Sequence, residues 1–186
     1  DSPITIELEK NTYEVKNVTA ITNTLINLEL SEAVDAAAST SDVVIKDATG
    51  KEVETKSVVL ANTKKNFKVT TADMTPGATY TVTINGKTLS FVANVADTVA
   101  PELSSVKAKS NTKVELTFSE KLDKDSAEDI ANYAISNNLN VVKAELNDNQ
   151  TKVTLTTSAQ TANTVYKVTV SKVTDLAGNA VNADKN

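Results

Sequence analysis

Acidic side chains are the residues of this chain whose types and spacing suggest chemistry. The pattern Ser-Glu-x-x-Asp occurs twice, with Glu32 and Asp35 in its first occurrence and Glu120 and Asp123 in its second. Carboxylate oxygens are ligands that Ca²⁺ prefers, so each pair is a candidate calcium site where a strand ends. The alternative interpretation is a pair of solvated loop residues, because an exposed Glu needs no special purpose.

Two further acids extend the calcium hypothesis. Asp175 begins an Asp-Leu-Ala-Gly-Asn segment, and Asp97 lies in a linker between two modules, which it would bridge through a cation. The predicted calcium ligands are therefore Asp97, Glu120, Asp123 and Asp175. The alternative for the Asp175 segment is a structural turn, since Asp and Asn bond nearby backbone and Gly allows positive φ. No cofactor is expected to be required.

The composition removes most catalytic chemistry. The chain has no Cys, no His and no Trp. Disulfides, thiolate or imidazole metal sites and His-assisted nucleophiles are therefore excluded. Hard-cation binding remains, as does catalysis by two carboxylates about 5–10 Å apart in a cleft. Because no motif places such a pair, we predict that the protein is not an enzyme.

Charge and hydropathy make nucleic acid and the membrane interior unexpected as partners. The net charge is −5, and all 19 basic residues are Lys. Nucleic-acid binding needs clustered basic residues and is not expected. Membrane insertion is not expected either, since no apolar run approaches the roughly 20 residues of a spanning helix.

The chain repeats itself. Residues 26–35 return as residues 114–123 with the same alternation of apolar and polar side chains, and residues 80–84 return as residues 166–170. A period of about 90 residues is too long for a solenoid repeat and is typical of small tandem domains.

The elements that must position the acids are strands. Alternation with period two, rich in Val, Ile, Thr and Tyr, runs through both copies. Strands are predicted at residues 4–8, 13–21, 24–31, 42–47, 51–60, 65–71, 78–84 and 87–93 of the first copy. Those of the second copy are predicted at 102–109, 112–119, 133–136, 140–147, 151–157 and 164–172. The fold class is all-β, with two tandem immunoglobulin-like Greek-key β-sandwiches at residues 1–96 and 97–186, joined by a short linker.

The most specific local prediction is a hairpin. Asn85 and Gly86 separate two alternating runs, and Asn-Gly is the strongest short signal for a type I′ turn. A two-residue loop pairs Ile84 with Lys87, Val82 with Leu89 and Tyr80 with Phe91.

Two smaller features complete the local predictions. Residues 126–133 are predicted to form a helical turn capped by Ser126 and Asp129, and residues 35–41 at most a weak one. Tyr80 and Tyr166 open equivalent strands and are predicted to be buried rings whose hydroxyls bond the backbone, as in a tyrosine corner.

Several of these segments resemble a known family. The linker at residues 97–101, the strand at 114–123 and the ending at 166–179 resemble the Ig-like repeats of surface-layer (S-layer) proteins from Bacillus-type bacteria. Residues 75–84 look like the corresponding ending in the first copy, which lacks the Asp-x-x-Gly-Asn segment. The resemblance implies seven-stranded sandwiches, an extracellular location in the cell wall, and a two-dimensional lattice, commonly with calcium.

The function expected from the resemblance is structural. The chain would be a non-catalytic module of an S-layer protein, and its partners would be neighbouring S-layer subunits and adjacent domains of the same chain. The alternative is a stalk or ligand-binding module of a bacterial adhesin. The opening residues Asp1, Ser2 and Pro3 are typical of a linker, so we expect the chain to be a piece of a longer protein.

Overall fold

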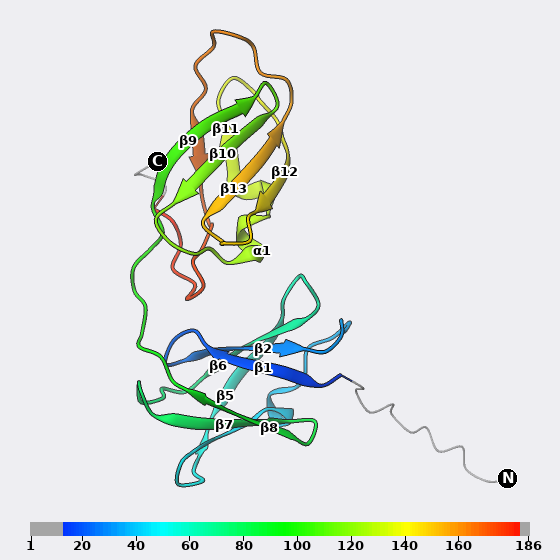
Figure 1. Ribbon diagram of the computed structural model, residues 1–186, viewed down its shortest axis with the longest axis vertical. Coiled ribbons are helices and arrows are strands. Elements are labelled where there is room, and N and C mark those ends of the chain that lie inside the picture. The colour runs from blue at the N-terminus through cyan, green and yellow to red at the C-terminus, as the bar shows by residue number, and fades with distance from the viewer. Residues whose placement is uncertain (1–12, 183–186) are drawn as a thin grey trace, which may run out of the picture. The chain divides into compact units, whose positions relative to one another are not determined.

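The computed structural model describes residues 13–182, and the chain divides into two compact units, Asp1–Ala96 and Asp97–Asn186. We call these units the first and the second module (Figure 1). Each has its own cluster of buried apolar side chains. The predicted strand at residues 4–8 lies outside the described residues. In the described part of the chain, no helix has the length and hydropathy needed to cross a membrane.

The first module is a sandwich of two four-stranded antiparallel sheets, in the orders β1-β2-β6-β5 and β4-β3-β7-β8. This is the strand order of the immunoglobulin sandwich with one additional short strand, β4. The strands are β1 (Val15–Ala20), β2 (Leu25–Leu30), β3 (Val44–Asp47), β4 (Glu52–Val53), β5 (Thr55–Leu60), β6 (Asn66–Thr71), β7 (Thr79–Ile84) and β8 (Lys87–Val92). A 3₁₀ helix, η1 (Thr40–Asp42), precedes β3 and lies at the end of the segment where at most a weak turn was predicted.

The core of the first module follows from strict alternation on its central strands. Every second residue of β2 and β6 is buried, and Leu28 and Phe67 are completely so. Phe67 packs edge-on against Tyr13, with ring centroids 5.4 Å apart. Burial of such large side chains is the main favourable contribution to folding a small sandwich.

The predicted hairpin is confirmed in its register. β7 and β8 pair Tyr80 with Phe91, Val82 with Leu89 and Ile84 with Lys87. The two turn residues have positive φ, as a type I′ turn requires. The Tyr80 and Phe91 rings are stacked, with centroids 5.9 Å apart.

Both predicted tyrosine corners have the expected hydroxyl contact. The Tyr80 hydroxyl accepts a hydrogen bond from the Thr75 N–H, and the Tyr166 hydroxyl accepts one from the Thr161 N–H, each at 2.9 Å. Tyr80 is buried, whereas Tyr166 is only half-buried. The prediction of burial is therefore wrong for the second ring.

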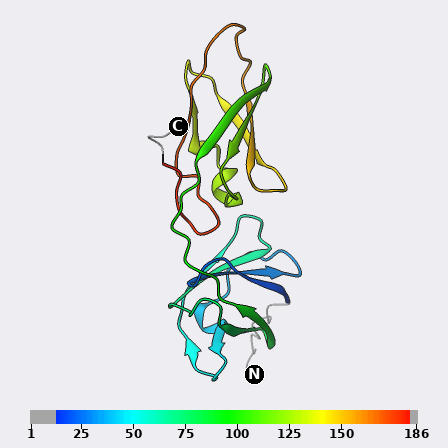
Figure 2. The ribbon, with the colours of Figure 1, turned by 60° about the vertical axis from the view of Figure 1, so that its left-hand side comes forward.

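The second module has a four-stranded sheet in the order β12-β13-β10-β9 and, among the described residues, a two-stranded sheet of β11 and β14 (Figures 1 and 2). Its strands are β9 (Leu103–Ser110), β10 (Lys113–Phe118), β11 (Tyr133–Ile135), β12 (Val141–Leu146), β13 (Lys152–Thr157) and β14 (Val168–Val170). Between β10 and β11 lie the short helix α1 (Lys124–Ala127) and the 3₁₀ helix η2 (Ile130–Asn132). The seven strands implied by the resemblance are thus exceeded in the first module and not reached in the described part of the second.

Equivalent hydrogen bonds within the two modules show which of their residues correspond. Ser31 N–H donates to the Glu14 carbonyl at 2.8 Å, and Ser119 N–H donates to the Glu102 carbonyl at 2.9 Å. The same serines accept bonds from the backbone N–H of these glutamates through their hydroxyls. β1 therefore corresponds to β9 and β2 to β10.

One predicted strand is divided in the structure. Instead of a single strand over residues 51–60, the chain forms β4 and β5, which belong to different sheets. The Thr55 hydroxyl donates to the Val43 carbonyl at 2.9 Å where the chain passes between the sheets. The alternation of side chains continues through this point, so the sequence pattern alone does not mark the crossing.

The last predicted strand is too long. β14 is much shorter than the predicted residues 164–172, because its partner β11 ends in a turn where Asn137 and Asn138 have φ of 60° and 54°. Just before β14, the Ser136 N–H still donates to the Lys167 carbonyl at 2.9 Å, but the Lys167 N–H donates to the Ser136 side-chain hydroxyl at 2.8 Å instead of to a backbone carbonyl.

Candidate metal centre

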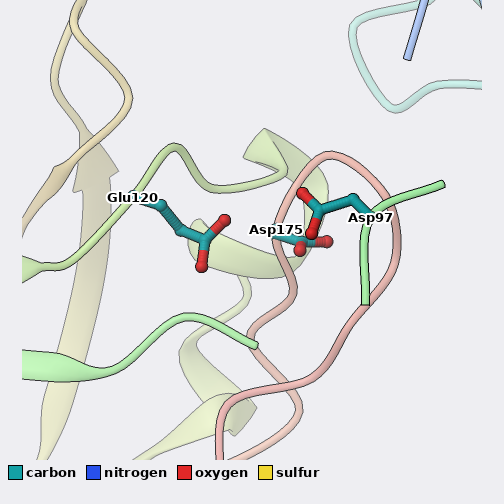
Figure 3. A group of neighbouring side chains, drawn as sticks. All are labelled: Asp97, Glu120 and Asp175. Atoms are coloured by element: carbon teal, nitrogen blue, oxygen red, sulfur yellow. The ribbon is translucent and has the colours of Figure 1, made fainter. Parts of the chain in front are cut away.

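Three carboxylates of the second module converge at one point. Asp97, Glu120 and Asp175 each offer one oxygen, and these oxygens all lie within 4.8 Å of one another. Figure 3 shows that the three side chains come from separate stretches of chain and that the Glu120 carboxylate is directed towards the other two. Asp97 is exposed, Glu120 is half-buried and Asp175 is buried.

Loops at the ends of strands position these acids. Asp97 precedes β9, Glu120 follows β10, and Asp175 lies in the turn after β14. The loop after β10 is joined to the turn after β14 by a bridge between Leu122 and Asp175. The Asp123 N–H also donates to the Thr174 carbonyl at 2.8 Å. The backbone therefore holds the loops of Glu120 and Asp175 together without help from the carboxylates.

Asn179 connects the segment before β9, which we call the leading segment, to this turn through hydrogen bonds. Its side-chain Nδ2 donates to the Asp97 carbonyl at 3.1 Å, to the Val99 carbonyl at 3.2 Å and to Asp175 Oδ2 at 2.8 Å. Its backbone N–H donates to Asp175 Oδ1 at 2.8 Å. The sequence prediction treated Asn179 only as a turn residue, because its contacts with residues 97 and 99 carry no local signal.

The three carboxylates repel one another. Burial, followed by the negative charges of Asp175 and Asp97, raises the pKa of the Glu120 carboxyl. Asp175 is only 2 % exposed, so water screens its charge poorly. A cation placed among the three oxygens would remove this repulsion.

The donor set fits a hard divalent cation. Oxygens bound to one Ca²⁺ lie about 2.3–2.6 Å from it, so two such oxygens are at most about 5 Å apart. The 4.8 Å limit found for the three carboxylates agrees with that spacing. The residues present would leave further coordination positions to backbone carbonyls or water.

The fourth predicted ligand has a different position. Asp123 is the N-cap of α1, where its Oδ1 accepts a hydrogen bond from the Ser126 N–H at 3.1 Å, and it is not a member of the acidic group. The predicted capping box of Ser126 and Asp129 is therefore wrong, and Asp129 is instead the N-cap of η2, where its side chain accepts a hydrogen bond from the Ala131 N–H. Ser126 instead donates its hydroxyl to the Asp123 carbonyl. An acid at the N-cap position accepts hydrogen bonds from backbone N–H groups of the first helical turn, which have no partner within the helix.

The corresponding acids of the first module do not form such a group. Within residues 13–182, Asp97, Glu120 and Asp175 are the one cluster of at least three potential metal-ligating acids, so Glu32 belongs to none. Asp35 contacts Lys64 at 2.7 Å, and the hydrogen bond and charge of Lys64 lower the pKa of the Asp35 carboxyl.

Fold and site together define a tandem of immunoglobulin-like sandwiches with an acidic cluster in one of them. A family described as bacterial Ig-like domain matches residues 6–98 and again residues 90–186. The chain therefore belongs to the bacterial Ig-like domain family.

One curated relative bears the name of a cell-wall protein. The chain is 32 % identical over 183 residues to a protein named outer cell wall protein from Brevibacillus brevis (strain 47). This match covers 88 % of the chain and only 17 % of the relative.

Solved structures show weaker likeness. The N-terminal part of the bacterial S-layer protein SbsC has a TM-score of 0.43 and 17 % identity, over 91 % of this chain and 42 % of that one. A pullulanase of Group B Streptococcus has a TM-score of 0.39 and 12 % identity, over 77 % of this chain and 19 % of that one.

Proposed function

We propose that this chain is a non-catalytic structural module of a bacterial cell-surface protein of the S-layer kind. The observation that carries the proposal is the 32 % identity over 183 residues to a protein named outer cell wall protein, on a chain made of two bacterial Ig-like modules. The location would be extracellular, in the cell wall. Its partners would be neighbouring subunits of a lattice and adjacent domains of the same chain.

The proposed mechanism is geometric. Outward-facing positions on β6 and β13, among them Lys68, Thr70, Thr154 and Thr156, present amines and hydroxyls on the solvent side of the sheets. Each such contact with a neighbour is weak on its own. Repetition of the same contacts across a lattice multiplies them by avidity.

We further propose that Ca²⁺ binds at Asp97, Glu120 and Asp175. The support is the convergence of three carboxylates and the raised pKa of Glu120. When bound, the ion would neutralise the cluster. The three acids would join the segment before β9 to the loops after β10 and β14, and Asn179 already connects that segment to the turn after β14 through hydrogen bonds.

Electron microscopy of the longer protein that carries this chain tests the proposed function. Ordered sheets that form with calcium and disperse with a chelator would support a lattice role for the cation. Sheets that form equally well in both conditions would contradict that role. A protein that forms no sheets but binds a glycan saturably on an array would favour the adhesin stalk instead.

A further inference from the structure

Strand β5 is an open edge of the first module, because it is the last described strand of the sheet β1-β2-β6-β5. Beyond its end, the Ala61 N–H donates to the Asn66 carbonyl at 2.9 Å. Hydrogen-bonded and non-hydrogen-bonded pairs alternate along an antiparallel ladder. Val58 and Leu60 therefore belong to pairs that are not hydrogen-bonded to β6, and their N–H and C=O groups point out of the edge.

The equivalent edge of the second module is protected by a side chain. β12 ends as β5 does, since the Asn147 N–H donates to the Lys152 carbonyl at 2.9 Å, which makes Leu146 the counterpart of Leu60. The Leu146 N–H points out of the edge and donates to Glu128 Oε1 at 3.1 Å. Glu128 is the C-cap residue of α1. A charged side chain placed at a sheet edge in this way hinders the addition of another strand.

β5 lacks this protection. The first module has η1 in place of α1, and η1 meets the other end of β5, where the Thr55 hydroxyl donates to the carbonyl of Val43, the C-cap of η1. Among residues 13–182, no side chain is hydrogen-bonded to the N–H of Val58 or Leu60. Val59 lies between them and is 55 % exposed. The edge therefore presents unpaired backbone groups on both sides of an exposed apolar side chain.

We propose that β5 of a second copy of this chain pairs antiparallel with β5, with the two Val59 residues opposite each other on a two-fold axis. In this register, Val58 of each copy lies opposite Leu60 of the other, so the outward-facing backbone groups of both strands bond one another. Main-chain hydrogen bonds of this kind join two sheets into one. Both copies use the same surface, so the contact is isologous and closes as a dimer. The inference names one contact of the proposed assembly and so rests on the proposed function, but it does not depend on cation binding.

Charge complementarity favours this occupant and its antiparallel direction. Glu54 immediately precedes β5, and Lys65 lies in the turn that follows it. Antiparallel pairing brings the acidic start of each strand beside the basic turn of the other. Lys56, the one base within β5, falls opposite Asn62 of the second copy. Glu52 and Glu54 also line a hollow between β4 and the start of β5, where the partner's Lys65 could place its amine.

The same pairing is unfavourable for β12. The counterpart of Val59 is Glu145, which comes directly before Leu146 as Val59 does before Leu60. Two copies of β12 in this register would place their Glu145 carboxylates opposite each other, and like charges directly opposite destabilise a strand pair. They would also have to break the hydrogen bond from Leu146 to Glu128. The contact is therefore a property of the first module.

Charge reversal at the two-fold axis tests the proposal in the whole chain, by sedimentation velocity over a wide concentration range. Wild type should pass from monomer to dimer as the concentration rises. Val59→Lys and Val59→Glu each place like charges opposite each other and should weaken dimerisation about tenfold or more. An equimolar mixture should regain the dimer, because Lys of one chain then faces Glu of the other. Val142→Lys is the matched control and should dimerise as wild type does, since Val142 is 61 % exposed on the protected strand β12.

Hydrogen–deuterium exchange locates the contact. The amides of Val58 and Leu60 should exchange more slowly at concentrations where the dimer dominates, because their N–H groups become bonded across the contact. The Leu146 amide is already bonded to Glu128, so its exchange should not depend on concentration.

Four outcomes would overturn the inference. They are a wild-type chain that stays monomeric at all concentrations, a Val59→Lys variant that dimerises as wild type does, a mixture of the two charge variants that fails to regain the dimer, and a wild-type dimer whose Val58 and Leu60 amides exchange as in the monomer. In each case, ordered sheets of the longer protein would leave the proposed function standing. A dimer confirmed by these tests in a longer protein that forms no sheets would overturn the proposed lattice role alone.

Discussion

Replacement of Glu120 by Gln should stabilise the second module when no cation is present. The carboxylate lies within 4.8 Å of those of Asp97 and Asp175. Two unit charges about 4 Å apart interact by about 1 kcal/mol in bulk water and about 4 kcal/mol at an effective dielectric constant of 20. Because Glu120 is half-buried and reaches solvent, we take the lower value for each pair, which gives about 2 kcal/mol as a minimum, since water screens the buried Asp175 less well.

Calcium should make wild type more stable than the Glu120→Gln variant, which is the reverse of the order expected without a cation. A ligand at a thousand times its Kd stabilises the folded state by about 4 kcal/mol. Wild type would gain this amount, whereas the Glu120→Gln variant lacks one of the three carboxylates and would gain much less. The variant should therefore unfold at a higher temperature than wild type in a chelator and at a lower temperature in saturating calcium.

Differential scanning calorimetry at neutral pH and low salt is the suitable assay, since the chain has no Trp. A change of 1 kcal/mol moves the midpoint of a domain of this size by about 4–8 °C. Glu32→Gln is the control, because Glu32 is the counterpart of Glu120 in the first module and is outside the acidic group. The reasoning is refuted if Glu120→Gln leaves the second-module transition unchanged in chelator, or if calcium raises that transition equally in both proteins.

Three further predictions concern the same modules. Without a cation, the stability of the second module should fall as pH rises from the ordinary Glu pKa through the raised pKa of Glu120, because the folded module holds that proton more tightly than the unfolded chain. Glu120→Gln should flatten this slope in calorimetry across pH, and an unchanged slope would contradict the assignment. Phe67→Ala, at a fully buried position, should cost the first module about 3–5 kcal/mol in a denaturant titration. A loss in the second-module transition as well would show that the modules do not unfold independently. Asn179→Ala removes donors to the Asp97 and Val99 carbonyls, so amide exchange at Val99 should accelerate in hydrogen–deuterium exchange. Unchanged exchange there would mean that other contacts hold the leading segment.

The hairpin prediction, which depended only on neighbouring residues, was accurate. The β7–β8 hairpin has the predicted register because Asn85 and Gly86 supply the required positive φ and the flanking residues alternate in the same phase. Turn geometry and hydrophobic pattern both act over a few residues there, so neither needs tertiary information.

Predictions of strand boundaries that depend on which neighbouring strand a segment pairs with were less accurate. The division of residues 51–60 into β4 and β5 has no break in alternation to announce it, and it depends on which sheet each half joins. The shortened β14 depends on where β11 turns away. Such boundaries are set by the neighbouring strand, which a local pattern does not contain.

The sequence by itself determined the duplication, the immunoglobulin-like class and the restriction of its site chemistry to oxygen ligands. Those properties follow from composition, from the repeat of about 90 residues and from the alternation of side chains within each copy. Only the tertiary structure decided that Asp97, Glu120 and Asp175 converge while Asp123 caps α1. Loops from distant parts of the chain meet at one end of the sandwich, which brings the three acids together. A carboxylate at a helix N-terminus accepts hydrogen bonds from the unpaired backbone N–H groups of the first turn.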